Sequence, residues 1–317
     1  MQIVVGDIGG THARFALARI AEERVVALDQ PVVLATADFA GLADAYAAFA
    51  TEIGQTLPRY AAFGVAGPVA AGPVHFINSH WVIDPNTITA DLCLDSALLI
   101  NDFGAMAHAV HALDEDSFVH ICGPDVPLPA QGAISVIGPG TGLGVAVLQR
   151  RDSGVVVLET EGAHVHFAPL NERERQVCAA ITARHGRTAI ERIVSGPGLG
   201  AILRCFQPAD TRNDAALWEG AISGTDPALN EALALLLASY GAAVGDLSLA
   251  HGAFGVVLTG GLTNRLRPLI GQSQFHARFC AKGRYQPRME SIPVKLITHP
   301  QPGLFGAAAA FAQEHSA

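Results

Sequence analysis

Apolar and polar residues alternate on both sides of a short glycine turn near the start of the chain. An apolar run ends at Asp7, two glycines and a threonine follow, and the alternation then resumes. A spacing of two residues between apolar positions is typical of a half-buried β-strand. The pattern therefore predicts strands over 2–7 and 12–19 that pair about a turn at Gly9 and Gly10.

The same plan of strand, glycine turn and strand recurs about 130 residues later, in 132–149. Elsewhere, apolar residues either recur with the spacing of an amphipathic helix or gather in short runs. Further strands are predicted over 24–34, 60–67, 97–102 and 254–262, and helices over 38–54, 171–185, 196–206 and 227–250, from Phe103 onwards and from Pro302 onwards. This mixture of hairpins, short buried strands and helices predicts an α/β fold with mixed sheets.

Two copies of the hairpin plan in a chain of 317 residues predict two lobes, because a single hydrophobic core rarely grows to this size. We expect a small α/β lobe over 1–110, completed by a C-terminal helix over 301–317, and a large α/β lobe over 111–300. One glycine hairpin in each lobe would place two sets of backbone N–H groups across one cleft.

Composition favours a cytoplasmic protein that binds neither nucleic acid nor membrane. Half of the residues are hydrophobic, 15% are charged, and the net charge of −9 argues against a nucleic-acid surface. The five cysteines stand without a CxxC pair, which is typical of a reduced protein without a cysteine zinc site. Two uncharged stretches of 18 residues, 132–149 and 247–264, contain several glycines, so we interpret them as strands and turns rather than membrane spans. The chain enters a strand at once, and no signal peptide is expected.

Three glycine turns follow apolar strands, and their sequences are Gly9-Gly10-Thr11, Gly138-Pro139-Gly140-Thr141-Gly142 and Gly260-Gly261. Glycine permits a close approach, so consecutive backbone N–H groups can point at one anion, and the threonines add hydroxyl donors. We interpret the three turns together as phosphate-binding. The alternative for each turn alone is a tight hairpin without a ligand.

Other nucleotide and hydrolase motifs fit poorly. The chain contains no GxxxxGK[ST] motif, which argues against a Walker-type loop, and no GxSxG motif, which argues against a hydrolase nucleophile. The stretch "GPGLGA" over 196–201 follows residues without the pattern of a strand. We therefore interpret it as the start of a helix rather than as a dinucleotide site.

Polar residues at strand ends are candidate ligands for a hydroxyl-rich molecule. Asn101 and Asp102 follow an apolar strand directly, and Asp102 opens a helix, where an aspartate is also a common N-cap. Glu161 and His164 flank a glycine further on. If this stretch is a strand, His164 and His166 share one face, but a metal site would need a third ligand that is not evident.

Glu191 is a further candidate ligand, because it lies among apolar residues. The alternative is an acid on a helix surface, paired with Arg192 or Arg187.

The motifs in this order identify a resemblance to bacterial glucokinases of the hexokinase and actin-like ATPase superfamily, in the group distinct from the ROK kinases. The resemblance covers essentially the whole chain. It rests on "GDIGGTHAR", "INDFGAMA", "GPGTGLGVA", "EGAHVHFAP", "ERIVSGPGL", "LTGGL", "KGR" and "QPGLFG". The cysteine-rich zinc motif of ROK kinases and the N-terminal DNA-binding domain of ROK repressors have no counterpart in the sequence.

This resemblance implies a two-lobed α/β fold of the actin-like or ribonuclease H-like ATPase type, with a mixed sheet in each lobe and a cleft between them. It implies ATP-dependent phosphorylation of glucose at the 6-hydroxyl, with Mg²⁺, by a cytoplasmic homodimer that feeds glycolysis. The alternatives are another hexose kinase on the same scaffold and a sugar-binding regulator without turnover.

The resemblance also assigns roles to residues of this chain. In the family these positions hold the nucleotide, the sugar and the transferred proton. The first phosphate loop comprises Gly6, Asp7, Ile8, Gly9, Gly10 and Thr11, with Asp7 helping to hold Mg²⁺; the second comprises Gly138, Gly140, Thr141 and Gly142; the adenosine motif comprises Gly260 and Gly261. The sugar ligands are Asn78, Asn101, Asp102, Glu161, His164 and Glu191, and Asp102 is also the catalytic base.

Three positions depart from the family pattern. His12 stands where asparagine is usual, Ala163 replaces the second glycine of EGGH, and His166 replaces an aspartate. None of these departures removes a ligand named above. Ala163 is expected to tighten the loop that binds the sugar.

Overall fold

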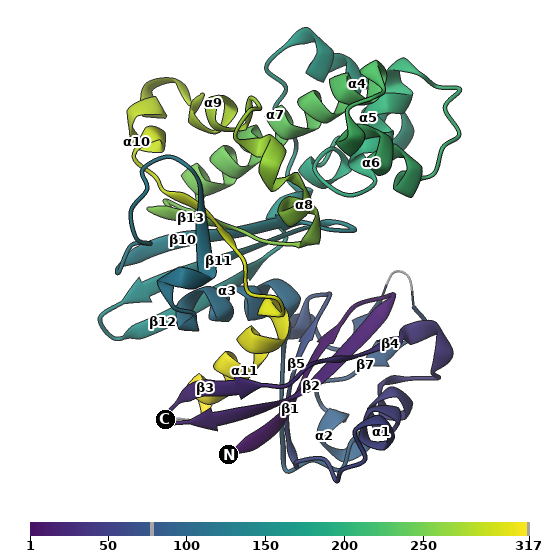
Figure 1. Ribbon diagram of the computed structural model, residues 1–317, viewed down its shortest axis with the longest axis vertical. Coiled ribbons are helices and arrows are strands. Elements are labelled where there is room, and N and C mark those ends of the chain that lie inside the picture. Colours follow the sequence, from purple (N-terminus) through teal and green to yellow (C-terminus); the bar gives the residue numbers. More distant parts are fainter. Residues whose placement is uncertain (77–78, 316–317) are drawn as a thin grey trace. The chain divides into compact units, whose positions relative to one another are not determined.

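The computed structural model describes residues 1–76 and 79–315, and the chain divides into two compact units (Figure 1). Unit 1 comprises Met1–Asp114, Val157–Glu159 and His299–Ala317. Unit 2 comprises Glu115–Val156 and Thr160–Thr298. Each unit contains one six-stranded sheet with helices packed on it.

The sheet of unit 1 is mixed and has the order β3-β2-β1-β5-β8, with β4 also paired to β2. Strands β1 and β2 form the antiparallel hairpin expected from the alternating pattern, whereas β5 and β8 run parallel to β1. The bounds are β1 Gln2–Ile8, β2 His12–Ala21, β3 Arg24–Leu28, β4 Val32–Ala35, β5 Tyr60–Val65 and β8 Ser96–Asn101. Shorter elements are β6 Val74–His75, β7 Val82–Ile83 and α2 Ile88–Asp91.

Alternation along β1 sends its side chains into two separate clusters. Ile3 and Val5 pack with helices α3 (Asp102–Ala112) and α11 (Pro302–Glu314). Val4 and Ile8 pack on the opposite face, with α1 (Leu42–Ile53). Figure 1 shows α11 and α1 on opposite sides of this sheet. Both faces are therefore buried, which explains the nearly continuous apolar sequence of β1.

Helices α3 and α11 approach each other closely because both are rich in alanine and glycine. A Cβ atom at Gly306 of α11 would lie 1.8 Å from the backbone oxygen of Ala105 in α3. Leu304, Ala307 and Phe311 of α11 are almost fully buried between this contact and the sheet. The C-terminal helix is thereby part of the core of unit 1.

The sheet of unit 2 repeats the plan of unit 1. A hairpin of β10 (Gly132–Pro139) and β11 (Leu143–Arg151) is followed by β13 (Gly255–Leu258) and β14 (Val294–Ile297), which run parallel to β10. Two edge strands, β12 (Gly154–Thr160) and β9 (Phe118–Cys122), complete the order β12-β11-β10-β13-β14-β9, although Val157–Glu159 of β12 groups with unit 1. The predicted internal repeat is thus a repeat of topology.

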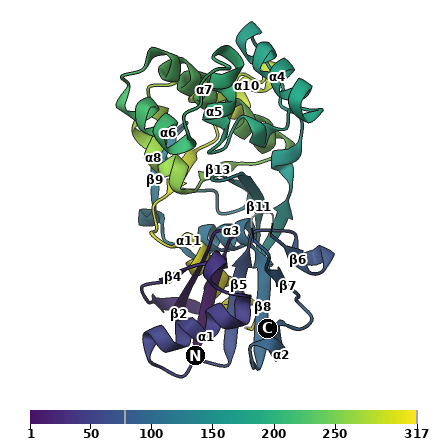
Figure 2. The ribbon, with the colours of Figure 1, turned by 90° about the vertical axis from the view of Figure 1, so that its right-hand side faces the viewer.

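Unit 2 also carries a helical layer whose centre is a long apolar helix, α7 (Pro227–Ala250). Its length and composition would suffice to cross a membrane, but 78% of its most apolar window is buried inside the protein. Core packing therefore accounts for its apolar residues. Figure 2 shows α5 and α6 close to α7, and its other neighbours include α9. The bounds are α4 Glu172–His185, α5 Gly198–Phe206, α6 Asp214–Ser223, α8 Gly261–Ile270, α9 Phe275–Cys280 and α10 Gln286–Glu290.

Most of the predicted helices and strands are confirmed, but the single strand over 24–34 is wrong. The chain forms β3 and β4, which pair with different parts of β2, and Pro31 lies between them. Proline has no backbone N–H to donate to a ladder, so the strand ends before it. The helix predicted over 38–54 begins only at Leu42, after the N-cap Gly41.

The close contact between α3 and α11 leads to a prediction about stability. Gly306→Ala should lower the free energy of unfolding by more than about 2 kcal/mol, because the added methyl group meets backbone that cannot move aside. Urea unfolding followed by circular dichroism measures the change. As a control, Gly271→Ala places its methyl group in open space and should change stability little. Equal stability of the two variants would contradict the close contact.

Candidate active site

The first glycine turn offers two backbone donors at the end of β1. The N–H of Gly9 donates to the oxygen of His12 at 2.9 Å and closes the hairpin. Thr36 donates through its hydroxyl to the oxygen of Gly10 at 2.9 Å, and its N–H donates to the oxygen of Thr11. Within residues 1–76 and 79–315, the N–H groups of Gly10 and Thr11 have no partner. Thr36 thus holds the carbonyl oxygens of Gly10 and Thr11, while the N–H groups of these two residues remain available to an anion.

The fold requires glycine at one position of this turn but not at another. A Cβ atom at Gly6 would lie 2.6 Å from the ring of Phe63, so packing against β5 demands glycine there. At Gly9 the nearest atom would be 3.6 Å away, so the fold alone does not require it. Ile8 is fully buried, so the structure gives no exposed atom of this predicted residue to a nucleotide.

Asp7 lies at the carboxyl end of β1, where it faces the start of α11. The Oδ2 atom of Asp7 is 3.5 Å from Nη1 of Arg14, and a Cβ atom at Gly303 would be 3.4 Å from its carboxyl carbon. Burial raises the pKa of Asp7 above its usual value, and the nearby Arg14 guanidinium offsets part of that rise. The charged carboxylate is therefore held in surroundings that disfavour it.

Asn101, not Asp102, is the N-cap of α3. The Oδ1 atom of Asn101 accepts from the N–H groups of Phe103 at 2.8 Å and Gly104 at 3.3 Å, and its amide donates to Gly67. Asp102 is the first helical residue, and its Oδ1 accepts from the N–H of Phe103 at 2.9 Å. The alternative interpretation of Asp102 as the N-cap is wrong, because the preceding asparagine takes that position.

Unit 1 brings Asp7 and Asp102 to the same edge of its sheet. Asp7 pairs with Gly64 in the parallel register of β1 and β5, and a Cβ atom at Gly64 would be 3.7 Å from the Cα atom of Asp102. The carboxyl ends of parallel strands are where α/β sheets bind ligands. Because Gly64 has no side chain, the start of α3 can lie close to β5 at this edge.

A third carboxylate at this edge, Glu159, is absent from the predicted set. Its Oε1 atom accepts from the N–H of Asn101 at 2.8 Å, and a Cβ atom at Gly104 would lie 2.5 Å from it. Glu159 lies in an alternating strand whose polar positions are expected to face solvent. The contact joins residues far apart in the chain, and nothing in the local pattern indicates it.

In unit 2, the second and third glycine turns pack directly against each other. A Cβ atom at Gly138 would lie 2.4 Å from the backbone oxygen of Thr259, and one at Gly260 would lie 2.8 Å from that of Pro139. Gly260 also has a φ of 94°, which favours glycine. These two glycines are required by the contact between the turns, whereas a Cβ atom at Gly261 would meet open space.

Inside the second turn, the N–H of Gly140 donates to the oxygen of Gly142 at 2.7 Å, so it is not available to a phosphate. The oxygen of Gly140 accepts from the N–H of Gly196, also at 2.7 Å. In the part of the chain that the structure describes, the amides of Thr141 and Gly142 have no partner. The donors that this turn can offer are therefore Thr141 and Gly142.

Glu191 is tied to the second turn rather than to a neighbouring arginine. It lies in the short 3-10 helix η5 (Ile190–Arg192), and its Oε2 atom accepts from the N–H of Leu143 at 3.0 Å. A Cβ atom at Gly142 would lie 2.3 Å from this oxygen. Glycine at position 142 thus makes room for the Glu191 carboxylate, and the surface-acid interpretation is wrong.

Glu161 and His164 lie at the two ends of the 3-10 helix η4 (Gly162–His164). The Nε2 atom of His164 is 3.6 Å from Oε2 of Glu161, and both side chains are more than half exposed. A strand that places His164 and His166 on one face is therefore wrong; His166 instead contacts the oxygen of Phe167. No cluster of three or more His, Cys, Asp or Glu residues suited to a metal ion occurs among the described residues. Asn78 lies outside them.

Comparisons with known proteins agree with this geometry. The family model named Glucokinase matches residues 4–314. A glucokinase of Zymomonas mobilis subsp. mobilis is 46% identical over 321 residues, which cover 100% of this chain and 99% of the relative. The chain belongs to the glucokinase family. The bacterial glucokinase resemblance is thereby confirmed.

Solved structures confirm the predicted fold class. The crystal structure of a glucokinase from an Antarctic psychrotroph is similar with a TM-score of 0.84 and 30% identity, over 100% of this chain and 99% of that one. A ROK family glucokinase from Streptomyces griseus, in complex with glucose and AMPPNP, is similar with a TM-score of 0.65 and 19% identity, over 99% and 100%. The fold is the α/β fold of these sugar kinases, with a mixed sheet in each unit.

The raised pKa of Asp7 predicts a gain in stability on removing its charge. A pKa above the unfolded value means that the wild-type chain loses stability as pH rises through the folded pKa. Asp7→Asn should therefore raise the free energy of unfolding at neutral pH, and its advantage should shrink as the solution is acidified. Urea unfolding midpoints across this pH range measure the difference. The exposed Asp29→Asn variant is the control, and a less stable Asp7→Asn at neutral pH would contradict the assignment.

Proposed function

We propose that this chain transfers the γ-phosphoryl group of ATP to the 6-hydroxyl of glucose, with Asp102 as the general base. Membership of the glucokinase family supports the reaction, which is ATP-dependent phosphorylation of glucose. The observation that supports the assignment of residues is the meeting of Asp7 and Asp102 at one sheet edge, beside a turn with two unpaired amides. Phosphoryl transfer needs placement and neutralisation of charge more than covalent chemistry.

Each unit, taken by itself, carries a turn whose backbone donors suit nucleotide phosphates. Unit 1 offers the amides of Gly10 and Thr11 with the threonine hydroxyl, and unit 2 offers those of Thr141 and Gly142. The adenosine motif at Gly260 and Gly261 opens helix α8, which adds the positive end of a helix dipole. Of the predicted glycines, Gly6, Gly138 and Gly260 serve by keeping these turns close to their neighbours.

Mg²⁺ would be held through the phosphates, with Asp7 as the carboxylate of the protein. One carboxylate beside hydroxyl and phosphate oxygens fits the habit of Mg²⁺, which keeps several water ligands and binds few protein groups. The disfavoured charge of Asp7 fits as well, because a cation nearby lowers the free energy of the ionised carboxylate. When bound, the ion neutralises charge that develops on the phosphates.

The sugar ligands in this proposal are Asn101, Glu161, His164 and Glu191, with Asn78 as predicted from the resemblance. Carboxylates accept strongly from vicinal hydroxyls because charge-assisted hydrogen bonds exceed neutral ones. The side-chain amide of Asn101 uses one hydrogen to donate to the oxygen of Gly67, and its oxygen accepts from the N–H of Phe103 in α3. Its second amide hydrogen is left for a sugar hydroxyl.

Asp102 takes the proton of the 6-hydroxyl. Its position is fixed by β8 before it and α3 after it, and the N-terminus of a helix favours the charged form of a carboxylate. Glu159 holds the N–H of Asn101 and so supports the start of the same helix.

A coupled assay of ADP release across a panel of hexoses tests the proposed reaction. Glucose should give the highest kcat/KM. A different preferred hexose would favour the alternative of another hexose kinase, and no turnover of any hexose would contradict the proposal. The homodimer and the cytoplasmic location remain predictions, which light scattering and cell fractionation test.

Asp102→Asn separates a catalytic from a structural role. We expect kcat to fall at least about a hundredfold, because asparagine cannot take a proton. Stability should stay near that of wild type, because Asn101 supplies the cap. The kcat per folded molecule and the urea midpoint are the two measurements. Retention of more than about a tenth of wild-type kcat would show that Asp102 is not the base.

Gly142→Ala tests the contact between Glu191 and the second turn. Its methyl group displaces the Glu191 carboxylate, the far end of a flexible side chain, so the protein should fold normally. The KM for glucose should rise about tenfold, as expected for one displaced charge-assisted contact. Gly140→Ala is the matched control, because its methyl group meets nothing within 4 Å, and its KM for glucose should not change. An unchanged KM for glucose in Gly142→Ala would refute the role of Glu191.

A further inference from the structure

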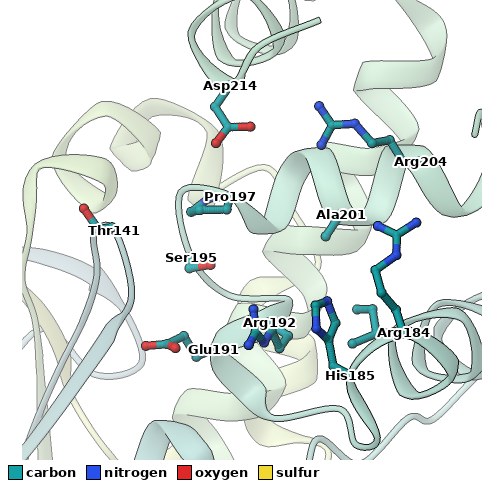
Figure 3. A pocket seen from close by; sticks show the side chains of 11 residues that line it. Thr141, Arg184, His185, Glu191, Arg192, Ser195, Pro197, Ala201, Arg204 and Asp214 are labelled. Carbon is teal, nitrogen blue, oxygen red and sulfur yellow. The ribbon is translucent and has the colours of Figure 1, made fainter. Parts of the chain in front are cut away.

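Unit 2 holds the carboxylate of Glu191 with a backbone donor and a neighbouring glycine. Figure 3 shows Glu191 and Thr141 of the second turn among the side chains that line a cavity of about 280 Å³. The carboxylate accepts from the N–H of Leu143, and Gly142 leaves the space that it fills. This cavity therefore belongs to the candidate active site.

Unit 1 repeats this arrangement at the start of α3, with Glu159 as the carboxylate. The Oε1 atom of Glu159 accepts from the N–H of Asn101 at 2.8 Å. A Cβ atom at Gly104 would lie 2.5 Å from Oε1, 3.1 Å from Cγ and 3.2 Å from Cδ of Glu159. Both sides of this contact belong to unit 1, because Val157–Glu159 groups with it. The end of the Glu159 side chain thus lies against the backbone of Gly104.

These contacts complete a capping box with a residue from outside the helix. In a capping box, the N-cap side chain accepts from the N–H of the third helical residue, and a Glu or Gln at that third position accepts from the N–H of the N-cap. The N-cap Asn101 accepts from the N–H of Gly104 at 3.3 Å, which is the first half. Gly104 is the third helical residue and has no side chain. Glu159 therefore supplies the second half from a strand that lies 58 positions after Asn101.

The topology of the sheet explains why Asn101 needs this acceptor. Strand β8, which ends at Asn101, is the last strand in the order of its sheet, and the outer edge of such a strand presents N–H groups without a ladder partner. Glycine is also a poor helix former. Its place in the first turn of α3 is explained by the space that Glu159 fills.

We propose that Glu159 is a positioning residue that fixes Asn101 and Asp102 for the phosphorylation of glucose, an inference that rests on the function proposed for those two residues. The side chain of Asn101 is already tied to Gly67 and to the first turn of α3. The bond from its N–H to Glu159 fixes its backbone as well, and Asp102 follows directly. A displacement of about 1 Å at a reacting group costs about a hundredfold in rate. Glu159 thus acts through Asn101.

The exposure of Glu159 separates positioning from stability. Because the residue is exposed, water can accept from the N–H of Asn101 once the carboxylate is removed. Water satisfies this donor but does not fix its direction. Removal of the carboxylate should therefore change the rate of the reaction more than the free energy of unfolding.

Steady-state kinetics of E159A and E159Q test the positioning role. E159A should lower kcat at least about fivefold and raise the KM for glucose, while the KM for ATP and the urea midpoint stay near wild type. E159Q keeps an oxygen acceptor of the same shape and should retain at least about half of wild-type kcat. The control E52A removes an exposed glutamate of α1 and should show wild-type kinetics. A wild-type kcat in E159A, or an equal loss in E159Q, would overturn the proposal.

Gly104 allows a second test, because a methyl group there acts through Glu159. G104A displaces the Glu159 carboxylate, the far end of a flexible side chain, and should lower kcat about as much as E159A does. In the E159A background the same change should cost no further activity, because the space is then empty and alanine favours the helix. Additive losses of kcat in the double variant E159A/G104A would overturn the proposal.

Hydrogen exchange tests the contact without any turnover. Exchange over residues 97–106, followed by mass spectrometry, should be faster in E159A than in the wild type and in E159Q, because the start of α3 loses an acceptor. Unchanged exchange in E159A would overturn the proposal. Asp102→Asn separates it from the proposed function. Full turnover in that variant would contradict the proposed base, whereas its loss of turnover together with a wild-type kcat in E159A would overturn the positioning role alone.

Discussion

Backbone segments at the candidate site approach so closely that a single Cβ atom would separate them, and the arrangement of the site depends on this approach. In unit 2, the end of β10 touches the turn before α8 at Gly138 and Gly260. Protein interiors are close-packed, so contacts of this kind leave no freedom to slide. The donors of the second turn and the start of α8 are consequently fixed relative to each other before any nucleotide binds.

The same constraint divides the glycines of the motifs into two groups. Gly6, Gly138 and Gly260 are required by neighbouring protein atoms, whereas Gly9, Gly140 and Gly261 have space around them. In the second group, neighbouring protein atoms do not require glycine, which is compatible with the proposed approach of a nucleotide. A motif written as a string of glycines conceals this difference, because the neighbours that impose it come from distant parts of the chain.

Much of the fold could be predicted because its signals are local. The hairpins follow from alternation about glycine turns, and the helices from their apolar spacing, so β1, β2, β10 and β11 were expected where they occur. The break between β3 and β4 was missed because apolar residues continue on both sides of Pro31. Asn101 and Asp102 were both expected at the start of α3, but local sequence does not decide which of two adjacent capping residues takes the cap.

The site was less predictable because its decisive contacts span long distances in the sequence. Glu159 reaches Asn101 across 58 positions, and Glu191 reaches Leu143 across 48. Single residues such as Asp7 could be named from a turn, but their partners become known only when the chain is folded.

In the proposed site, the carboxylate of Glu191 would both hold the second turn through Leu143 and bind the sugar. An ionised carboxylate has about four acceptor positions on its two oxygens, and Leu143 occupies one position on Oε2. The remaining positions can accept from sugar hydroxyls without breaking this bond. Because the bond exists without a bound sugar, the second turn is held in place in advance by a residue that we propose as a sugar ligand. Under that proposal, no binding energy is spent on ordering the turn, and a sugar that moved Glu191 would also disturb the proposed phosphate donors.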